Sequence, residues 1–261
     1  MRLGYLGPKG TFSYETCKKY DKNAEFIQYR TITETIDGLD KLDVDEVIVP
    51  IENSIQGGVT ETIDKLINSN NIFIKKEIIL NISHNLMANK KYNLDEIKEI
   101  YSHPQALAQC RGFIEENLRD AIINEVSSTA LSAKEVKNKD NVACIANLSC
   151  STEYNLEIIR ENIQDNNLNK TKFWILSKQK NISGNKMSMI FATKHIPGAL
   201  YNVLGIFNNN KINLTKIESR PAKTSFGEYY FLVDLEVNKN IQKAISELEN
   251  ECQFLKILGI Y

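Results

Sequence analysis

The first part of the chain alternates short apolar runs with stretches whose apolar residues recur at helical spacing. Short apolar runs bounded by polar residues are typical of buried strands. Between them, the apolar residues of 59–67 and of 104–118 fall on one face of a helix. This order of strand and helix favours an α/β domain with largely parallel sheets. The predicted strands are "LGYL" (3–6), "EVIVPI" (46–51), "EIY" (99–101), "IINEV" (122–126) and "VACIA" (142–146).

A different pattern begins after the polar segment "SKQKNISGNK" (177–186), which we interpret as a linker. In "YYFLVDLEV" (229–237) every second residue is apolar, as in a strand with one buried face. Apolar residues at helical spacing around 200–207 and 241–248 indicate two helices. The resulting order, βαββαβ, is that of a ferredoxin-like domain. Its predicted strands are 187–193, 212–219, 229–237 and 254–261.

Polar side chains gather where the strands of the first region give way to helices. In open α/β sheets, ligands bind at these carboxyl ends of strands. The unpaired N–H groups of the helices that begin there favour anions. The sequence therefore predicts a ligand site formed by several of these segments. They are "GPKGTFSYE" (7–15), "PIENSIQGGVTE" (50–61), "SHPQALAQC" (102–110) and "SSTALSAKE" (127–135).

Each of these segments also has a purely structural interpretation. Ser102 and Gln105 form an S-x-x-Q pattern that can cap a helix. Ser128 or Thr129 can cap the helix that follows. The glycine pair in "IQGGV" (55–59) can simply form a turn. Both interpretations remain open for these residues.

The segment "PIENS" (50–54) is more informative than a cap or a glycine pair. Glu52, Asn53 and Ser54 place three polar side chains directly after an apolar run. A turn needs only one such residue, so the excess of polar groups favours a binding or catalytic role, although a turn is not excluded.

Composition and charge narrow the classes of function. The chain has 261 residues, enough for two domains, with 42% hydrophobic and 25% charged residues. Its 32 basic and 33 acidic side chains give a formal net charge of -1, which gives no indication of a nucleic-acid partner. The sequence contains no signal peptide and no apolar run long enough to span a membrane. Five cysteines without a C-x-x-C pattern favour reduced thiols in a cytoplasm.

Common motifs for metals, nucleotides and acyl transfer are absent from the sequence. It contains no G-x-G-x-x-G, no Walker-type loop and no G-x-S-x-G. The three histidines have no metal-ligand spacing, so no metal site is predicted; they are His84, His103 and His195.

Six segments, taken together and in order, resemble the prephenate dehydratase family. The resemblance covers almost the whole chain and implies a catalytic domain (1–178) followed by an ACT regulatory domain (186–261). It implies a catalytic domain of two α/β lobes, like those of type II periplasmic binding proteins, with the active site between them. No chorismate mutase-like segment precedes Met1, so we expect the monofunctional form. The segments are "LGPKGTFSYET", "VPIENSIQGGVTETID", "YSHPQALAQC", "VSSTALSAKEV", "ENIQDNNLNKTKF" and "GALYNVLGIF…INLTKIESRP".

The resemblance also implies a reaction. Prephenate loses its ring carboxylate as CO2 and its ring hydroxyl as water, giving phenylpyruvate on the route to phenylalanine, and no cofactor is expected. The essential threonine of the family lies in a T-R-F motif, which matches Thr171. A hydroxyl held in a dry site can assist departure of hydroxide by donating a hydrogen bond. The substrate-binding residues implied are Thr11, Glu52, Asn53, Ser54, Ser102, Gln105, Ser128, Thr129, Lys172 and Phe173.

The chain departs from the T-R-F motif at Lys172, where the family has arginine. Lysine is a point charge, whereas arginine offers a planar fork of donors, so the exchange is not neutral at a bidentate site. If the segment is a strand, Thr171 and Phe173 share one face and Lys172 points to the other. Lys172 then supports the site from behind, and direct contact with the substrate is the alternative.

The second region resembles the ACT domain that binds phenylalanine in this family, between domains of neighbouring subunits. A homodimer or homotetramer is therefore expected, with phenylalanine as allosteric effector. For the "GAL" and "ESRP" motifs, helix initiation and a strand end are the local alternatives. The effector-binding residues implied are Gly198, Ala199, Leu200, Asn213, Glu218, Ser219, Arg220 and Pro221.

Two alternative functions remain open at this stage. Arogenate dehydratase acts on the amino-acid form of the same ring, and one sequence does not separate the two substrates. A non-catalytic ligand sensor with two lobes and an ACT module is the alternative from another class. A sensor has no need of Thr171 together with "PIENS" and "SHPQ", so these three features favour the enzyme.

Overall fold

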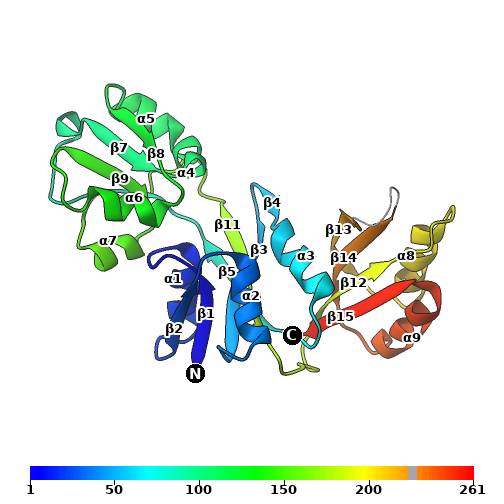
Figure 1. Cartoon of the computed structure of the whole chain (residues 1–261). Helices are drawn as coiled ribbons and strands as arrows, with labels where there is room; N and C mark the ends of the chain where they lie inside the picture. The colour runs from blue at the N-terminus through cyan, green and yellow to red at the C-terminus, as the bar shows by residue number, and fades with distance from the viewer. Residues whose placement is uncertain (223–227) are drawn as a thin grey trace. The chain divides into compact units, whose positions relative to one another are not determined.

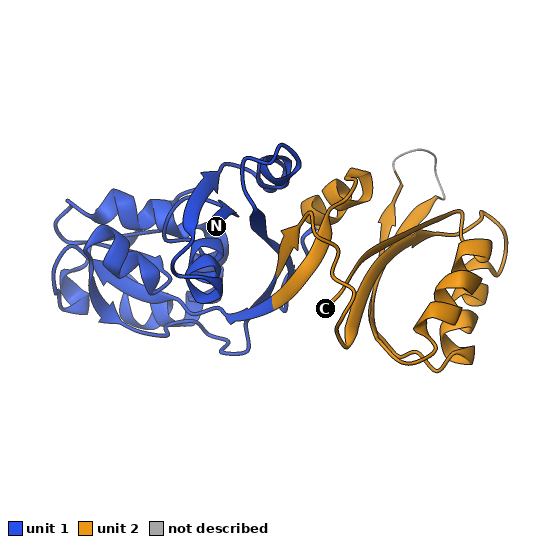
Figure 2. Ribbon diagram, turned by 90° about the horizontal axis from the view of Figure 1, so that it is seen from below, with its two compact units in different colours: residues 1–59, 78–173 blue, residues 60–77, 174–261 orange. Residues whose placement is uncertain are grey.

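The computed structural model describes residues 1–222 and 228–261. Its helices and strands follow one another along the chain as drawn in Figure 1. By internal contacts the chain divides into two compact units, coloured in Figure 2, and the division runs through two strands of one sheet. The units are residues 1–59 with 78–173, and residues 60–77 with 174–261.

The first sheet has its strands in the order β2-β1-β3-β11-β5, with the short β4 paired to β3. β1 runs parallel to both β2 and β3. Val47, Ile48 and Val49 of β3 are completely buried, as the continuous apolar run predicts for a central strand. The strands are β1 (Arg2–Leu6), β2 (Glu25–Tyr29), β3 (Glu46–Asn53), β4 (Gly57–Gly58), β5 (Phe73–Asn81) and β11 (Lys170–Ser177).

The second sheet has the order β10-β6-β9-β7-β8. β7 is parallel to β8 and β9, whereas β6 is antiparallel to both β9 and β10. The prediction of largely parallel sheets is therefore right for one side of this sheet and wrong for the other. Its strands are β6 (Asn85–Ala88), β7 (Glu99–Ser102), β8 (Ile122–Glu125), β9 (Val142–Ala146) and β10 (Glu157–Arg160).

The chain passes from the first sheet to the second between β5 and β6 and returns between β10 and β11. This confirms the predicted fold of two α/β lobes. No helix within the described ranges is both long and apolar enough to span a membrane. The helices of this part are α1 (Phe12–Tyr20), α2 (Ile32–Asp40), α3 (Thr60–Asn68), η1 (Leu94–Glu96), α4 (Pro104–Gln109), α5 (Arg111–Asn117), α6 (Thr129–Val136) and α7 (Ser149–Tyr154).

The helix predicted over 104–118 is two helices, α4 and α5, and the single helix was wrong. The break lies at Cys110, whose φ and ψ of -115° and 18° are not helical. Leu107, Cys110, Ile114 and Leu118 nevertheless all lie in one buried cluster. The apolar stripe thus identified the buried face correctly, but the backbone turns within it.

The C-terminal domain confirms the predicted ferredoxin-like order. Its antiparallel sheet has the order β13-β14-β12-β15. The two helices contact each other (Figure 1). Both contribute to the core that also contains Met187, Phe191 and Val233 of the sheet. The elements are β12 (Lys186–Ala192), α8 (Ala199–Asn209), β13 (Leu214–Pro221), β14 (Tyr229–Glu236), α9 (Ile241–Glu251) and β15 (Phe254–Ile260).

Helix α3 belongs by its contacts to the C-terminal unit. Arg220 of β13 binds Asp64 of α3 through two nitrogens, with its Nη2 2.8 and 2.9 Å from the two carboxylate oxygens. Its Nε lies 3.2 Å from Oδ1. Lys256 of β15 donates to the carbonyl oxygens of Leu66 and Ser69, at the C-terminal end of α3. A cation there is favourable because the last carbonyls of a helix have no partners within it.

Candidate functional site

A cavity of about 330 Å³ opens within the first unit where several strands end and helices α1 and α6 begin. Seven of the predicted site residues line it, which brings together segments from five parts of the sequence. These are Thr11, Asn53, Gln105, Ser128, Thr129, Thr171 and Phe173. The other lining residues include Phe12, Ser13, Pro50, Gln56, His84, His103, Gln109 and Ser127.

Two of the lining hydroxyl groups cap helices. The hydroxyl of Thr11 accepts the backbone N–H of Tyr14 at 3.3 Å, at the start of α1. The hydroxyl of Ser128 accepts the backbone N–H of Leu131 at 3.0 Å, at the start of α6. The structural interpretation of Ser128 as a cap is thus confirmed. Both helices begin at the cavity, where their N-terminal dipoles favour an anionic ligand.

Asn53 and Thr171 form the centre of the polar lining. The Oδ1 atom of Asn53 accepts the backbone N–H groups of Ile55 (3.0 Å) and Gln56 (3.1 Å), a turn that short amide side chains favour. Its Nδ2 atom therefore points the other way and lies 2.9 Å from Thr171 Oγ1. An amide NH2 group only donates, so Thr171 accepts there and keeps its own hydrogen for another acceptor.

The hydrogen bonds continue from Asn53 through three further side chains. Asn53 Nδ2 donates to Asn169 Oδ1 at 2.7 Å, and Asn169 Nδ2 donates to Gln109 Oε1 at 3.0 Å. His84 Nε2 lies 2.8 Å from the same Gln109 oxygen. Burial lowers the pKa of His84, although its bond to Gln109 acts in the opposite direction, so the imidazole is neutral near pH 7.

Asn169, Gln109 and His84 were not predicted as site residues from the sequence. Signals for two of them were present in the sequence. Asn169 precedes Thr171 by two residues, the spacing of side chains on one face of a strand. Gln109 follows Gln105 by four residues, the spacing of one helix face. His84 has no comparable signal, because its partner lies 25 residues away in the chain.

Ser102 and Ser54 lie outside the cavity lining. Ser102 is fully buried and donates to the carbonyl of Ile145 at 2.6 Å. The proposed capping box of Ser102 and Gln105 is wrong: His103 is the N-cap of α4, and its Nδ1 accepts the N–H of Gln105 at 3.2 Å. The hydroxyl of Ser54 donates to the backbone carbonyl of Leu168 and accepts the backbone N–H of Lys170. These two hydrogen bonds connect the "PIENS" segment to the start of β11, the strand that contains Thr171.

Lys172 and Glu52 also lie outside the lining and form an ion pair, with Nζ and Oε2 2.9 Å apart. Thr171 and Phe173 line the cavity and Lys172 does not, as expected from strand alternation. The two charged side chains therefore couple β3 to β11 just outside the cavity.

The described residues contain no group of three or more His, Cys, Asp or Glu side chains positioned to hold a metal ion. All five cysteines are free thiols, and burial raises the pKa of each of them. None of the five lines the cavity.

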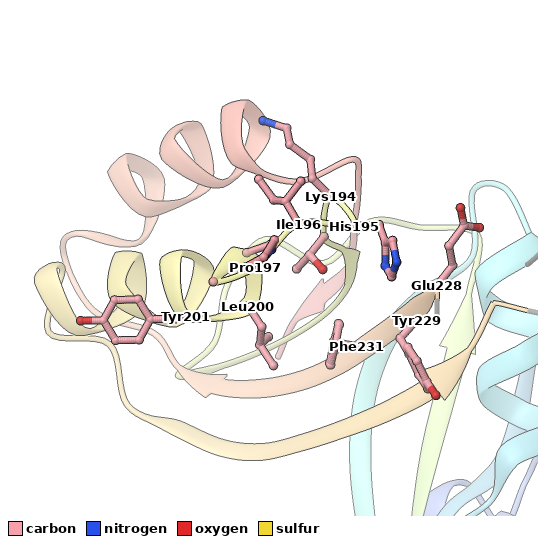
Figure 3. A pocket seen from close by; sticks show the side chains of 12 residues that line it. Lys194, His195, Ile196, Pro197, Leu200, Tyr201, Glu228, Tyr229 and Phe231 are labelled. Carbon is pink, nitrogen blue, oxygen red and sulfur yellow. The ribbon is translucent and has the colours of Figure 1, made fainter. Parts of the chain in front are cut away.

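A second cavity, of about 470 Å³, lies in the C-terminal domain (Figure 3). Gly198, Ala199 and Leu200 of the "GAL" motif line it, together with Tyr229 and Phe231 of β14. Gly198 is the N-cap of α8, and its φ of 81° is a conformation that glycine adopts without strain. In Figure 3, the ring of Tyr201 points away from the other labelled side chains that line the cavity.

The remaining predicted effector residues do not line this cavity. Glu218, Ser219, Arg220 and Pro221 lie on β13, and Asn213 directly precedes that strand. Glu218 pairs with Lys216, with their charged atoms 3.0 Å apart, and Arg220 is engaged by Asp64. Within one chain, the "GAL" motif therefore lines the second cavity, and the "ESRP" motif lies outside it.

Both parts of the chain match known protein families. Residues 3–181 match the family model for prephenate dehydratase, and residues 190–253 match that for the ACT domain. A prephenate dehydratase of Lactococcus lactis subsp. cremoris is 37% identical over all of this chain and 97% of that protein.

Two solved structures superpose closely. The complex of an Arthrobacter aurescens prephenate dehydratase with L-Phe has a TM-score of 0.91 at 29% identity, covering 99% of this chain and 89% of that one. A protein described as a quorum-quenching acylase has a TM-score of 0.90 at 26% identity, covering 99% and 97%. The family match over more than half of the chain and the identity to the Lactococcus protein both indicate the same family. This chain therefore belongs to the prephenate dehydratase family and carries an ACT domain in its C-terminal part.

Proposed function

We propose that the cavity of the first unit converts prephenate to phenylpyruvate, CO2 and water, within a catalytic domain at 1–178. The observation that carries this proposal is the Thr171 hydroxyl, which lines the cavity and accepts from Asn53. Its hydrogen is thereby available for the oxygen that leaves the substrate. Family membership and this donor support the same reaction.

The reaction requires a neutral hydrogen-bond donor at the leaving oxygen. It also requires groups that bind the carboxylates of the substrate. The electron pair of the bond between the ring and its carboxylate moves into the ring as CO2 departs. The bond between the ring and its hydroxyl oxygen breaks, and its electron pair stays on that oxygen. Thr171 donates a hydrogen bond to the oxygen as negative charge develops there, and a proton taken up from solvent completes the water that leaves. The N-termini of α1 and α6, at Thr11 and Ser128, suit the two substrate carboxylates.

Turnover of purified protein tests this proposal directly. We expect phenylpyruvate to form from prephenate at a higher kcat/KM than the corresponding product forms from arogenate. A preference for arogenate would reassign the substrate within the same site. Binding of prephenate without turnover would instead support the non-catalytic sensor. Because a fold does not fix chemistry, acyl-amide hydrolysis is a useful third assay, given the structural likeness to an acylase.

We propose further that phenylalanine regulates the enzyme through the ACT domain, which we assign to residues 186–261. In the second cavity, Leu200, Tyr229 and Phe231 offer apolar surface to an aromatic ring. The N-terminus of α8 at Gly198 suits the carboxylate of an amino acid, and Glu228, which also lines the cavity, suits its ammonium group. The L-Phe complex of the Arthrobacter relative supports this assignment.

Regulation by phenylalanine through the ACT domain is consistent with a homodimer or homotetramer, which we propose here. We also propose that the protein is cytoplasmic. Tyr201 and Ile196 line the second cavity yet expose 79% and 57% of their surface. Exposed apolar side chains beside a ligand cavity favour a contact with another subunit. Sedimentation with and without phenylalanine measures the assembly, and a monomer under both conditions would refute this part of the proposal.

The ion pair between Arg220 and Asp64 leads us to expect that a substitution at Asp64 alters regulation by phenylalanine. Arg220 belongs to the "ESRP" motif, and Asp64 lies on α3, the helix that follows the "PIENS" segment. We therefore expect Asp64→Asn to raise the phenylalanine concentration for half-inhibition by about fivefold or more, since allosteric coupling is typically ~1–3 kcal/mol. Basal turnover should change little, because Asp64 does not line the catalytic cavity.

Inhibition curves for Asp64→Asn and for Asp120→Asn check this expectation. Asp120 is exposed and lies in the other unit, so its variant controls for the lost charge. Equal inhibition of Asp64→Asn and the wild type would show that the ion pair carries no coupling.

A further inference from the structure

We propose that His103 is a specificity-determining residue, whose Nε2–H group donates to the side-chain ketone of prephenate and disfavours the ammonium group of arogenate. This inference rests on the proposed function and extends it, because it names the group that separates the two candidate substrates. It follows from the hydrogen bond that His103 forms with helix α4 and from the kinds of side chain that line the cavity of the first unit.

The two substrates differ at one position of the side chain, where prephenate carries a ketone and arogenate carries an amino group. Near neutral pH, the ketone oxygen only accepts hydrogen bonds, whereas an ammonium group only donates them. A residue that distinguishes the two substrates must therefore have a single hydrogen-bond role. An amide or a hydroxyl has no single role, because it can turn either a donor or an acceptor toward the ligand.

The hydrogen-bond role of His103 is set by the start of helix α4. His103 is the N-cap of this helix, and its Nδ1 atom accepts the backbone N–H of Gln105 at 3.2 Å. A backbone N–H group can only donate, so Nδ1 carries no hydrogen. The hydrogen of the imidazole ring is therefore on Nε2, which donates and cannot accept.

The Nε2 atom of His103 is available to a ligand. His103 is partly exposed and lines the cavity of the first unit. Its Nε2 atom forms no hydrogen bond with the described residues and is not one of the enclosed polar atoms that lack a partner. It differs in this respect from Nδ1 of His84, which protein atoms enclose. A ligand in the cavity can therefore supply the acceptor that Nε2 lacks.

The other side chains that line this cavity do not separate the two substrates. No Asp or Glu is among the described residues that line it, so the lining offers no carboxylate to an ammonium group. Several lining side chains form no hydrogen bond within the described part of the chain, but they are amides and hydroxyls, which can take either role. These side chains are Ser13, Gln56, Gln105, Ser127 and Thr129.

Arogenate would meet the His103 donor with another donor. Its ammonium group cannot accept from Nε2, so the hydrogen bond that prephenate makes would be lost. A site that hydrogen-bonds one group of a substrate discriminates against an analogue that cannot form the bond, because the protein group is left without a partner. The two carboxylates and the ring hydroxyl are common to both substrates, so their proposed binding at α1, α6 and Thr171 does not contribute to the preference.

Replacement of His103 by asparagine removes the donor and keeps the helix cap. The Oδ1 atom of asparagine can accept the N–H of Gln105, but its amide does not reach the position of Nε2. We expect His103→Asn to lower the ratio of kcat/KM for prephenate to kcat/KM for arogenate by about 10-fold, the effect of one lost hydrogen bond. Because both values come from the same variant, general damage to the cavity cancels in the ratio.

An unchanged ratio would overturn the proposal. If arogenate is bound but not converted, its inhibition constant against prephenate takes the place of kcat/KM, and the same change is expected. Complete rejection of arogenate by both the wild type and His103→Asn would also overturn the proposal, since another group would then determine the preference.

Gln105→Leu is the matched control. Gln105 lines the same cavity from the helix that His103 caps, but its amide can donate or accept. Leucine has a similar size and no polar group, so this variant should change kcat/KM for the two substrates by similar factors. A change in the ratio as large as that of His103→Asn would show that the preference does not depend on the single role of His103.

Imidazole ¹⁵N chemical shifts of the full-length chain test the tautomer independently of turnover. The chain has three histidines, and the signals lost in His103→Asn identify those of His103. We expect Nε2 to be protonated and Nδ1 bare, and a protonated Nδ1 would refute the donor role even in an active dehydratase. Absence of turnover of both substrates with the expected tautomer would refute the proposed function and the proposed ligand, but not the hydrogen-bond role of His103.

Discussion

Replacement of Thr171 by alanine is expected to lower kcat for prephenate by about 100- to 10,000-fold, the range that a positioned proton donor contributes. In the proposed reaction this hydroxyl donates to the leaving oxygen, because it lines the cavity and already accepts from Asn53. Alanine removes the donor and leaves the N-termini of α1 and α6 in place. KM should therefore change much less than kcat.

Thr171→Val and Thr171→Ser distinguish the hydroxyl from the shape of the side chain. Valine keeps the volume and removes the donor, so it should be as inactive as alanine. Serine keeps the donor and removes a methyl group, so it should retain substantial activity. Initial rates of phenylpyruvate formation measure all three variants, and thermal unfolding shows whether each one folds. A valine variant with the kcat of the wild type would exclude the threonine from the mechanism.

The fold of the C-terminal domain was predictable almost completely from the sequence. The apolar residues at every second position of "YYFLVDLEV" include Val233 and Leu235, which pack in the core with α8 and α9, so the alternation identified this buried face of β14. It did not indicate that Leu232 and Asp234 on the other face are buried as well. The two helices showed clear apolar stripes because each buries one face in the same core.

In the first region, β2, β4, β5, β6 and β10 were not predicted. All but β5 are short and carry no comparable apolar run, and in β5 the charged residues Lys75, Lys76 and Glu77 interrupt the apolar pattern. The antiparallel pairing of β6 and β10 depends on contacts that periodicity does not encode.

The cavity of the first unit was predictable in outline, because strand ends and helix starts meet at one edge of an α/β sheet. That rule grouped the segments of Thr11, Asn53 and Ser128, and all three residues line the cavity, whereas Thr171 was selected by the family resemblance. The rule did not separate residues that line the cavity from residues that support it. Ser102 lies at such an edge too, but the register of β7 and β9 directs its hydroxyl to a backbone carbonyl.

The contacts between residues far apart in the chain could not be predicted from the sequence, for a different physical reason. Asn53 and Asn169 are 116 residues apart, and Asp64 and Arg220 are 156 residues apart. Each pair is defined by how separate elements pack, and no local pattern records that packing. Arg220 illustrates the consequence: its motif indicated an effector contact, whereas its guanidinium binds a carboxylate on α3.

Replacement of Asn53 by aspartate is expected to lower kcat by about 100-fold although the two side chains have the same shape, because it reorients a donor on which transition-state stabilisation depends. One carboxylate oxygen would still accept from Ile55 and Gln56 and so preserve the turn. The other oxygen would replace Nδ2 at 2.9 Å from Thr171 Oγ1. Thr171 would then donate to this carboxylate, and its hydrogen would no longer reach the substrate.

The new negative charge would also repel a substrate with two carboxylates, so a matched control must carry the same charge. Gln56 lines the same cavity, and its side chain forms none of the contacts of Asn53 with Thr171. We expect Gln56→Glu and Asn53→Asp both to raise KM, but only Asn53→Asp to lower kcat strongly. Steady-state kinetics with prephenate separates these two effects. Equal kcat values for the two variants would mean that Asn53 does not set the direction of the Thr171 hydroxyl.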